Sequence, residues 1–185
     1  MLDPTSEIAS TTATIFPKTP VSSTSHVSDD GTRLSPNGIY LTLREIGWYQ
    51  KYHWALLVAT SPISGTLLHQ TRPNSEAKWA YTAQPEDFAS SRAMLVALKL
   101  GELPDTSPEW MAAVDECVRS ASVRGSEPFT CRTWAMAAVY TLADGGFIDL
   151  EPCWEKVGMV EEEAKALVAG ATSLDTKIVV SSKYL

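Results

Sequence analysis

Residues 53–70 read HWALLVATSPISGTLLHQ, and this stretch decides the fold. Its first eight residues form a short, almost wholly apolar run that is typical of a β-strand. Residues 61–65 have the composition of a turn, and residues 66–70 return as a second strand. We therefore predict a β-hairpin, with His53 at the start of one arm and His69 near the end of the other.

Further strands are expected on both sides of this hairpin, followed by helices. Apolar runs and partial alternation predict strands at residues 39–46 and 78–82 and an edge strand at 177–180. Residues 94–103 are ambiguous between a strand and a helix, and the short apolar run that stops at Gly101 favours a strand. Ser107 and Pro108 have the residue types of a helix start, and apolar residues recur at helical spacing after them. Two more helices are predicted at residues 131–143 and 152–169. A sheet first and helices afterwards indicate an α+β fold, with an antiparallel sheet packed against helices.

The first 36 residues differ in composition from the rest of the chain. They are crowded with serine and threonine, interrupted by four prolines and poor in aromatic residues. Such a segment buries too little apolar surface to offset its ordering entropy. We predict a flexible tail at residues 1–36 and a single domain at residues 37–185.

Charge and motif content exclude several classes of function. Fifteen basic against 22 acidic residues give a net charge of −7, which disfavours binding to nucleic acid or to anionic membranes. The chain has no apolar stretch long enough for a transmembrane helix and no secretory leader pattern at its start. Three cysteines without a CxxC pair indicate neither a disulfide framework nor a zinc ribbon, so a cytoplasmic protein is expected. Walker A, GxGxxG and GxSxG motifs are missing, and no cofactor is predicted.

The candidate chemistry lies in one cysteine and two histidines. Thr130 is a suitable N-cap, which makes Cys131 the first residue of its helix. Backbone N–H groups at a helix start lower a thiol pKa and stabilise an oxyanion. A nucleophilic thiol also needs an imidazole base and a group that orients it, and the hairpin supplies His53 and His69. The opposing interpretation is a buried structural cysteine with two surface histidines.

These residues resemble the circularly permuted papain-like thiol enzymes of the NlpC/P60 superfamily, above all the lecithin–retinol acyltransferase and phospholipase/acyltransferase group. That group carries a His-Trp-Ala strand, a histidine on the next strand and a cysteine that opens a later helix. The resemblance covers about residues 38–145 and implies a permuted papain-like architecture. It implies that Cys131 is the nucleophile, His53 the general base and His69 its orienting partner. The expected function is acyl transfer from an amide, ester or thioester, in a small molecule or a peptide, to water, an amine or an alcohol.

Two alternative functions and two further interpretations accompany this hypothesis. The residues that flank Cys131 differ from the family motif, which favours a catalytically inactive papain-like binding module as the alternative function. Zinc ligation by the two histidines and Cys131 is a weaker possibility, because a fourth ligand is missing, and no metal is predicted. Glu161-Glu162-Glu163 is interpreted as a solvated helix face. The aromatic residues proposed to bind substrate are Tyr52, Trp54, Trp79 and Trp134.

Overall fold

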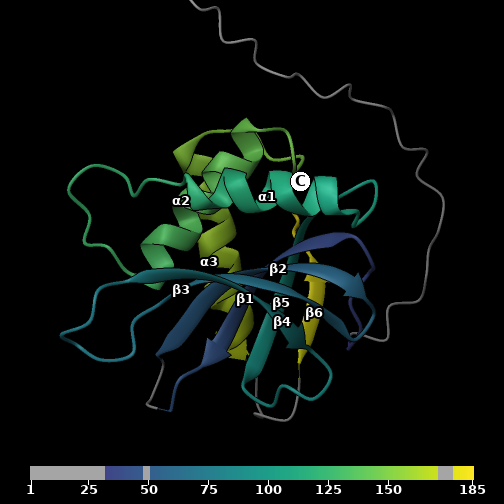
Figure 1. Ribbon diagram of the computed structural model, residues 1–185, viewed down its shortest axis with the longest axis horizontal. Coiled ribbons are helices and arrows are strands. Elements are labelled where there is room, and N and C mark those ends of the chain that lie inside the picture. The colour runs from purple at the N-terminus through teal and green to yellow at the C-terminus, as the bar shows by residue number, and fades with distance from the viewer. Residues whose placement is uncertain (1–31, 48–50, 171–176) are drawn as a thin grey trace, which may run out of the picture.

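The computed structural model describes residues 32–47, 51–170 and 177–185. Within them the chain forms six strands and three helices in an α+β arrangement (Figure 1). The strands are β1 (Gly38–Glu45), β2 (Tyr52–Ser61), β3 (Ser64–Thr71), β4 (Ala80–Asp87), β5 (Met94–Glu102) and β6 (Ile178–Ser181). The helices are α1 (Pro108–Arg119), α2 (Cys131–Asp144) and α3 (Trp154–Gly170).

All six strands belong to one sheet, in the order β4-β3-β2-β1-β5-β6. Every neighbouring pair is antiparallel except β5 and β6, which are parallel. The predicted hairpin is β2–β3, with Leu56 opposite Leu68. The predicted edge strand is β6, and the ambiguous run at 94–103 is strand β5.

The strand predicted at residues 78–82 has different bounds from those expected. Strand β4 begins at Ala80 instead of residue 78 and continues to Asp87. It therefore contains Pro85, which lacks a backbone donor and normally interrupts a strand. Strand β4 is an edge of the sheet, where one side of the backbone needs no partner, so proline is tolerated there.

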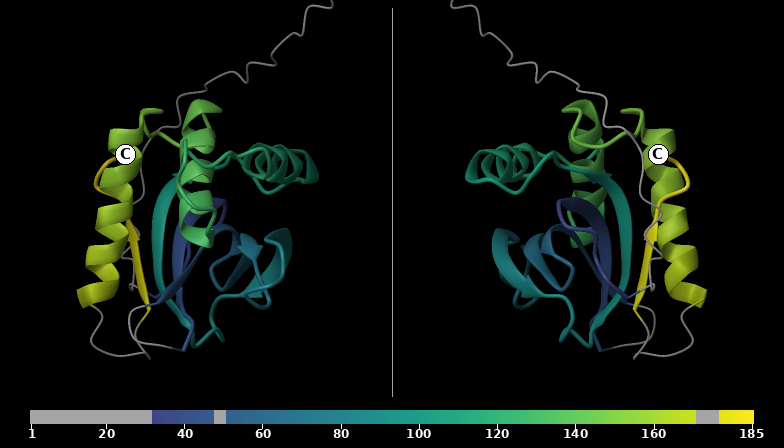
Figure 2. Two further views of the ribbon diagram at one scale, coloured as in Figure 1. Left: turned by 90° about the vertical axis from the view of Figure 1, so that its left-hand side faces the viewer. Right: turned by 90° about the vertical axis from the view of Figure 1, so that its right-hand side faces the viewer.

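The two faces of the sheet carry separate apolar cores. On one face, alternate strand residues pack with α1, α2 and α3; these strand residues include Leu41, Leu43, Trp54, Leu56 and Val58. We call this the helix face. In Figure 2, α1 lies above the β2–β4 part of the sheet and α3 runs beside β6.

The opposite face is enclosed by the sheet itself, and we call it the concave face. Arg44 of β1 forms an ion pair with Glu86 of β4, although β2 and β3 separate these strands in the sheet. Such a contact requires a strongly curled sheet. The core inside the curl contains Tyr40, Ala55, Leu57, Ala59, Leu67, Phe88, Met94, Ala97, Val179 and Leu34.

Leu34 corrects the predicted domain boundary. Its side chain is 2% exposed in the concave core, and its backbone N–H donates to the carbonyl oxygen of Pro62 at 3.0 Å. The folded domain therefore includes residues before 37. Of the predicted tail, residues 1–31 lie outside the described residues.

Candidate functional site

The two hairpin histidines meet as predicted. His53 Nε2 lies 2.8 Å from His69 Nδ1, and the rings are nearly perpendicular. A neutral imidazole has one nitrogen that donates and one that accepts. One of the two rings therefore donates an N–H to the other, and the tautomers decide which ring is the donor. The antiparallel pairing of β2 with β3 positions both rings, because it brings the start of one strand beside the end of the other.

The surroundings of this pair favour neutral imidazoles. Burial lowers the pKa of His53 to about 4, and the nearby His69 and Arg44 act in the same direction. Burial and Arg44 also lower the pKa of His69, against a smaller opposing effect of Glu86. A cation beside two neutral rings is a poor environment for imidazolium, which a general base must become during catalysis.

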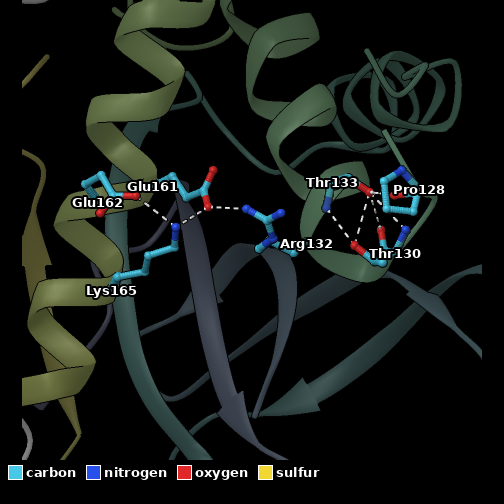
Figure 3. Close-up of polar contacts among 7 residues, drawn as sticks. All are labelled: Pro128, Thr130, Arg132, Thr133, Glu161, Glu162 and Lys165. Carbon is cyan, nitrogen blue, oxygen red and sulfur yellow. Dashed lines mark hydrogen bonds and ion pairs between the residues drawn. The ribbon is translucent and has the colours of Figure 1, made fainter. Parts of the chain in front are cut away.

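Cys131 lies at the start of α2, as predicted, and the helix cap is well formed. Thr130 Oγ1 accepts from the backbone N–H of Thr133, and Thr133 Oγ1 accepts from the backbone N–H of Thr130. Thr133 Oγ1 also donates to the carbonyl oxygen of Pro128 at 2.9 Å. These contacts, which Figure 3 shows for Pro128, Thr130 and Thr133, fix the loop that immediately precedes Cys131.

The structure does not bring Cys131 to the histidines. Successive residues of a strand point to opposite faces, and Trp54 contributes to the helix-face core. Its neighbour His53 therefore points to the concave face, as do Ala55 and Leu57. Cys131 packs against the helix-face core, so the sheet separates its thiol from both rings. The predicted convergence of Cys131, His53 and His69 is wrong for this structure, because the alternation of β2 puts the tryptophan on the side where the base was expected.

A cavity of about 540 Å³ opens beside Cys131 on the helix face. It lies between the end of β1, the start of β2, the start of α2 and the end of α3. Its lining residues are Ile46, Lys51, Tyr52, Trp54, Thr130, Cys131, Arg132, Lys165, Val168 and Ala169. We call it the Cys131 pocket. Two of the aromatic residues predicted to bind substrate, Tyr52 and Trp54, form part of its wall.

The other two predicted aromatic residues lie elsewhere. Trp134 is 1% exposed and packs in the helix-face core against the ring of Tyr81. Trp79 precedes β4, where its ring lies 5.9 Å from that of Phe129 and Arg72 lies over it. Neither residue lines the Cys131 pocket.

The sequence interpretation missed a charged cluster at the pocket wall. Arg132 Nη1 and Lys165 Nζ each lie 2.5 Å from the same atom, Oε1 of Glu161 (Figure 3). Glu161 has a side chain only 14% exposed, so the predicted solvated face is wrong at this position. Glu163 also makes contacts within the protein, because its carboxylate accepts hydrogen bonds from Ser182 Oγ and from the backbone N–H of Lys183. Lys165 follows Glu161 by four residues, a spacing that could have indicated their pair.

The described residues do not assemble a metal centre from the candidate ligands. Among residues 32–47, 51–170 and 177–185, no group of three or more histidine, cysteine, aspartate or glutamate side chains could hold a metal ion. Cys117, Cys131 and Cys153 are all free thiols. Burial raises the pKa of Cys117 to about 11, so its thiol is protonated at neutral pH.

No helix within the described part of the chain combines the length and apolar character needed to cross a bilayer. Comparison of the chain with family models, curated proteins and solved structures gives no match.

Proposed function

We propose that the protein is a binding module that takes a small, largely apolar molecule into the Cys131 pocket. The observation that carries the proposal is the pocket itself. Its volume of about 540 Å³ lies within the usual range for small-molecule sites. Apolar walls from three different elements, with a few polar groups at the rim, are the composition expected of such a site.

The pocket is also built on rigid parts of the molecule. Trp54 is 4% exposed in the helix-face core, and Val168 of α3 is 6% exposed in the same core. The capped start of α2 holds Thr130 and Cys131 in place. A preformed cavity costs a ligand little conformational reorganisation, which supports binding as the role of this site.

We propose in addition that the domain is an altered member of the permuted papain-like group. Support comes from the order of its parts: a hairpin with two histidines, then a helix that begins at a cysteine and packs on the same sheet. The placement of the histidines on the concave face is the departure. It is consistent with a papain-like scaffold that has kept a pocket and lost its catalytic dyad.

The acyl-transfer enzyme predicted from the sequence needs a further rearrangement. His53 would have to reach the helix face, which requires a one-residue shift of β2 that would reverse every side chain of that strand. Such a shift would take Leu56 and Val58, both fully buried, out of the helix-face core and place them on the concave face. Binding without this chemistry is therefore the function that we propose.

Uptake of an uncharged fluorescent probe, N-phenyl-1-naphthylamine, tests the binding function. We expect saturable binding with one site per chain. Ala169→Trp places a large ring at the rim of the pocket and should weaken binding at least tenfold. Ala166→Trp is the matched control, because Ala166 is exposed on the same helix and does not line the pocket. Equal binding by both variants and the unchanged protein would overturn the proposal.

Thiol labelling separates this function from the enzyme. An activated nucleophile would make Cys131 react with iodoacetamide at neutral pH much faster than Cys153, which is similarly half-buried. We expect comparable rates for these two thiols and a slower rate for Cys117, because burial raises the pKa of the Cys117 thiol. A Cys131 rate more than about a hundredfold above that of Cys153 would favour the enzyme.

A further inference from the structure

We infer that the ligand of the Cys131 pocket is an amphipathic carboxylate, a molecule with an apolar body and one anionic end. The inference rests on the proposed binding function and adds the chemical class of the ligand. It comes from the charges around the pocket and from how two of them are held.

The charge of the pocket lining is opposite in sign to the net charge of the protein. The chain as a whole carries 22 acidic against 15 basic residues. The ten residues that line the pocket include the cations Lys51, Arg132 and Lys165 and no acidic residue. A positive site in a protein of net negative charge attracts an anion and disfavours cations.

Arg132 and Lys165 form a ready clamp for a carboxylate. They extend from two different helices, yet their charged nitrogens meet at one oxygen atom of Glu161, each at 2.5 Å. The two cations are thus held side by side at the pocket wall (Figure 3). A guanidinium has five N–H donors and an ammonium three, so donors remain for a second carboxylate.

The acidic neighbours reduce this positive charge without cancelling it. Glu161 contacts both cations, and Glu162 contacts Lys165 at 2.8 Å. Glu162 has a side chain 73% exposed, so water screens its contribution. Three cations against these two carboxylates leave one positive charge at the pocket, and Lys51 is the third cation of its lining.

The remaining lining supplies the apolar part of the site. Ile46, Val168 and Ala169 are aliphatic, and Tyr52 and Trp54 add aromatic surface. Burying an alkyl chain or a ring against these walls provides the affinity, while the cations fix its orientation. A free carboxylate is not an acyl donor, so Cys131 would form part of the wall and would not be acylated by this ligand.

Paired ligands of equal chain length test the inference by calorimetric titration at neutral pH. We expect octanoate to bind at least tenfold more tightly than 1-octanol, and octylammonium to bind more weakly than 1-octanol. Arg132→Gln and Lys165→Gln should each weaken octanoate binding about three- to tenfold and weaken 1-octanol binding by a clearly smaller factor. Both side chains are more than 40% exposed, so the variants should fold. Lys156→Gln is the control, since Lys156 lies on α3 and lines neither cavity.

The outcomes distinguish this inference from the function on which it rests. Equal affinity for octanoate and 1-octanol would overturn the carboxylate inference and leave the binding module intact. The same conclusion would follow if Lys156→Gln weakened octanoate binding as much as Lys165→Gln. If neither ligand bound and N-phenyl-1-naphthylamine also failed to bind, the binding function itself would be wrong.

Discussion

Each face of the sheet packs into an apolar core, but the polar groups at the margins of the two cores differ. The helix face ends in a pocket with a thiol and three cations at its margin. The concave face ends in two hydrogen-bonded imidazoles beside the Arg44–Glu86 ion pair. A cysteine and two histidines that look like one catalytic group in the sequence are therefore divided between two separate environments. Function has to be assigned to each face on its own.

The largest effect is expected from opening the concave core. Phe88 is 1% exposed there, and Phe88→Ala should lower the free energy of unfolding by about 3–5 kcal/mol. Phe129, which is 41% exposed, is the matched control, and Phe129→Ala should cost under about 1 kcal/mol. Urea denaturation measures both. Equal losses would mean that the concave face is not a closed core comparable with the helix face.

Acid should act on the concave face through the histidines. Above pH 6.5 the imidazole of His53 is neutral in both the folded and the unfolded chain. Below that pH His53 becomes protonated in the unfolded chain but stays neutral in the folded chain, because burial lowers the folded pKa of His53 to about 4. Stability should therefore fall between pH 6.5 and 4, by on the order of 3 kcal/mol from this residue.

Denaturation at several pH values in His53→Gln isolates this effect from the titration of acidic residues. The variant should lose less stability than the unchanged protein over the same interval. Parallel pH curves for the two proteins would contradict the neutral imidazole pair.

Removing the cap of α2 should have a smaller effect on the helix face. Thr130→Ala deletes the oxygen that accepts from the backbone N–H of Thr133, at an expected cost of about 1 kcal/mol. Thr130→Ser keeps that oxygen and should retain most of the stability. A thermal melt compares the two variants, and an equal loss in both would assign the effect to the methyl group instead of the cap.

The smallest stability effect is expected at the pocket wall. Lys165 has a side chain 41% exposed, its partner Glu162 is 73% exposed, and the more buried Glu161 keeps its ion pair with Arg132 when Lys165 is removed. Lys165→Gln should change the free energy of unfolding by less than about 1 kcal/mol. A much larger loss by urea denaturation would show that this cluster stabilises the helix face instead of serving the pocket.

Much of the fold could be predicted from local patterns. Apolar runs and turn residues located the hairpin, and the cap and proline residues located the helices, because these signals depend on near neighbours. The bounds of β4 and the burial of Leu34 could not be found in this way. Pro85 is allowed only because β4 is an edge, and Leu34 is buried only because the sheet curls over it. Both depend on residues distant in the chain.

In the candidate site, too, some features could be predicted from near neighbours in the sequence and others could not. The contact between His53 and His69 follows from hairpin pairing, and Cys131 follows from the cap at Thr130. Which face each residue occupies does not follow, since a strand with apolar residues on both sides gives no alternation to set its orientation. β2 is such a strand, with Trp54 buried on one face and Ala55 on the other.

The pairing of β6 with β5 has a consequence for the order of events during folding. β6 is parallel to β5, and all three helices lie between them in the chain. During synthesis the edge of β5 that faces away from β1 keeps its backbone donors and acceptors unpaired until β6 has been made and pairs with it. Val179 also completes the concave core only at that moment. A chain in which β6 has not yet paired would thus present the open edge of β5 to neighbouring chains, so protection from self-association depends on residues 178–181.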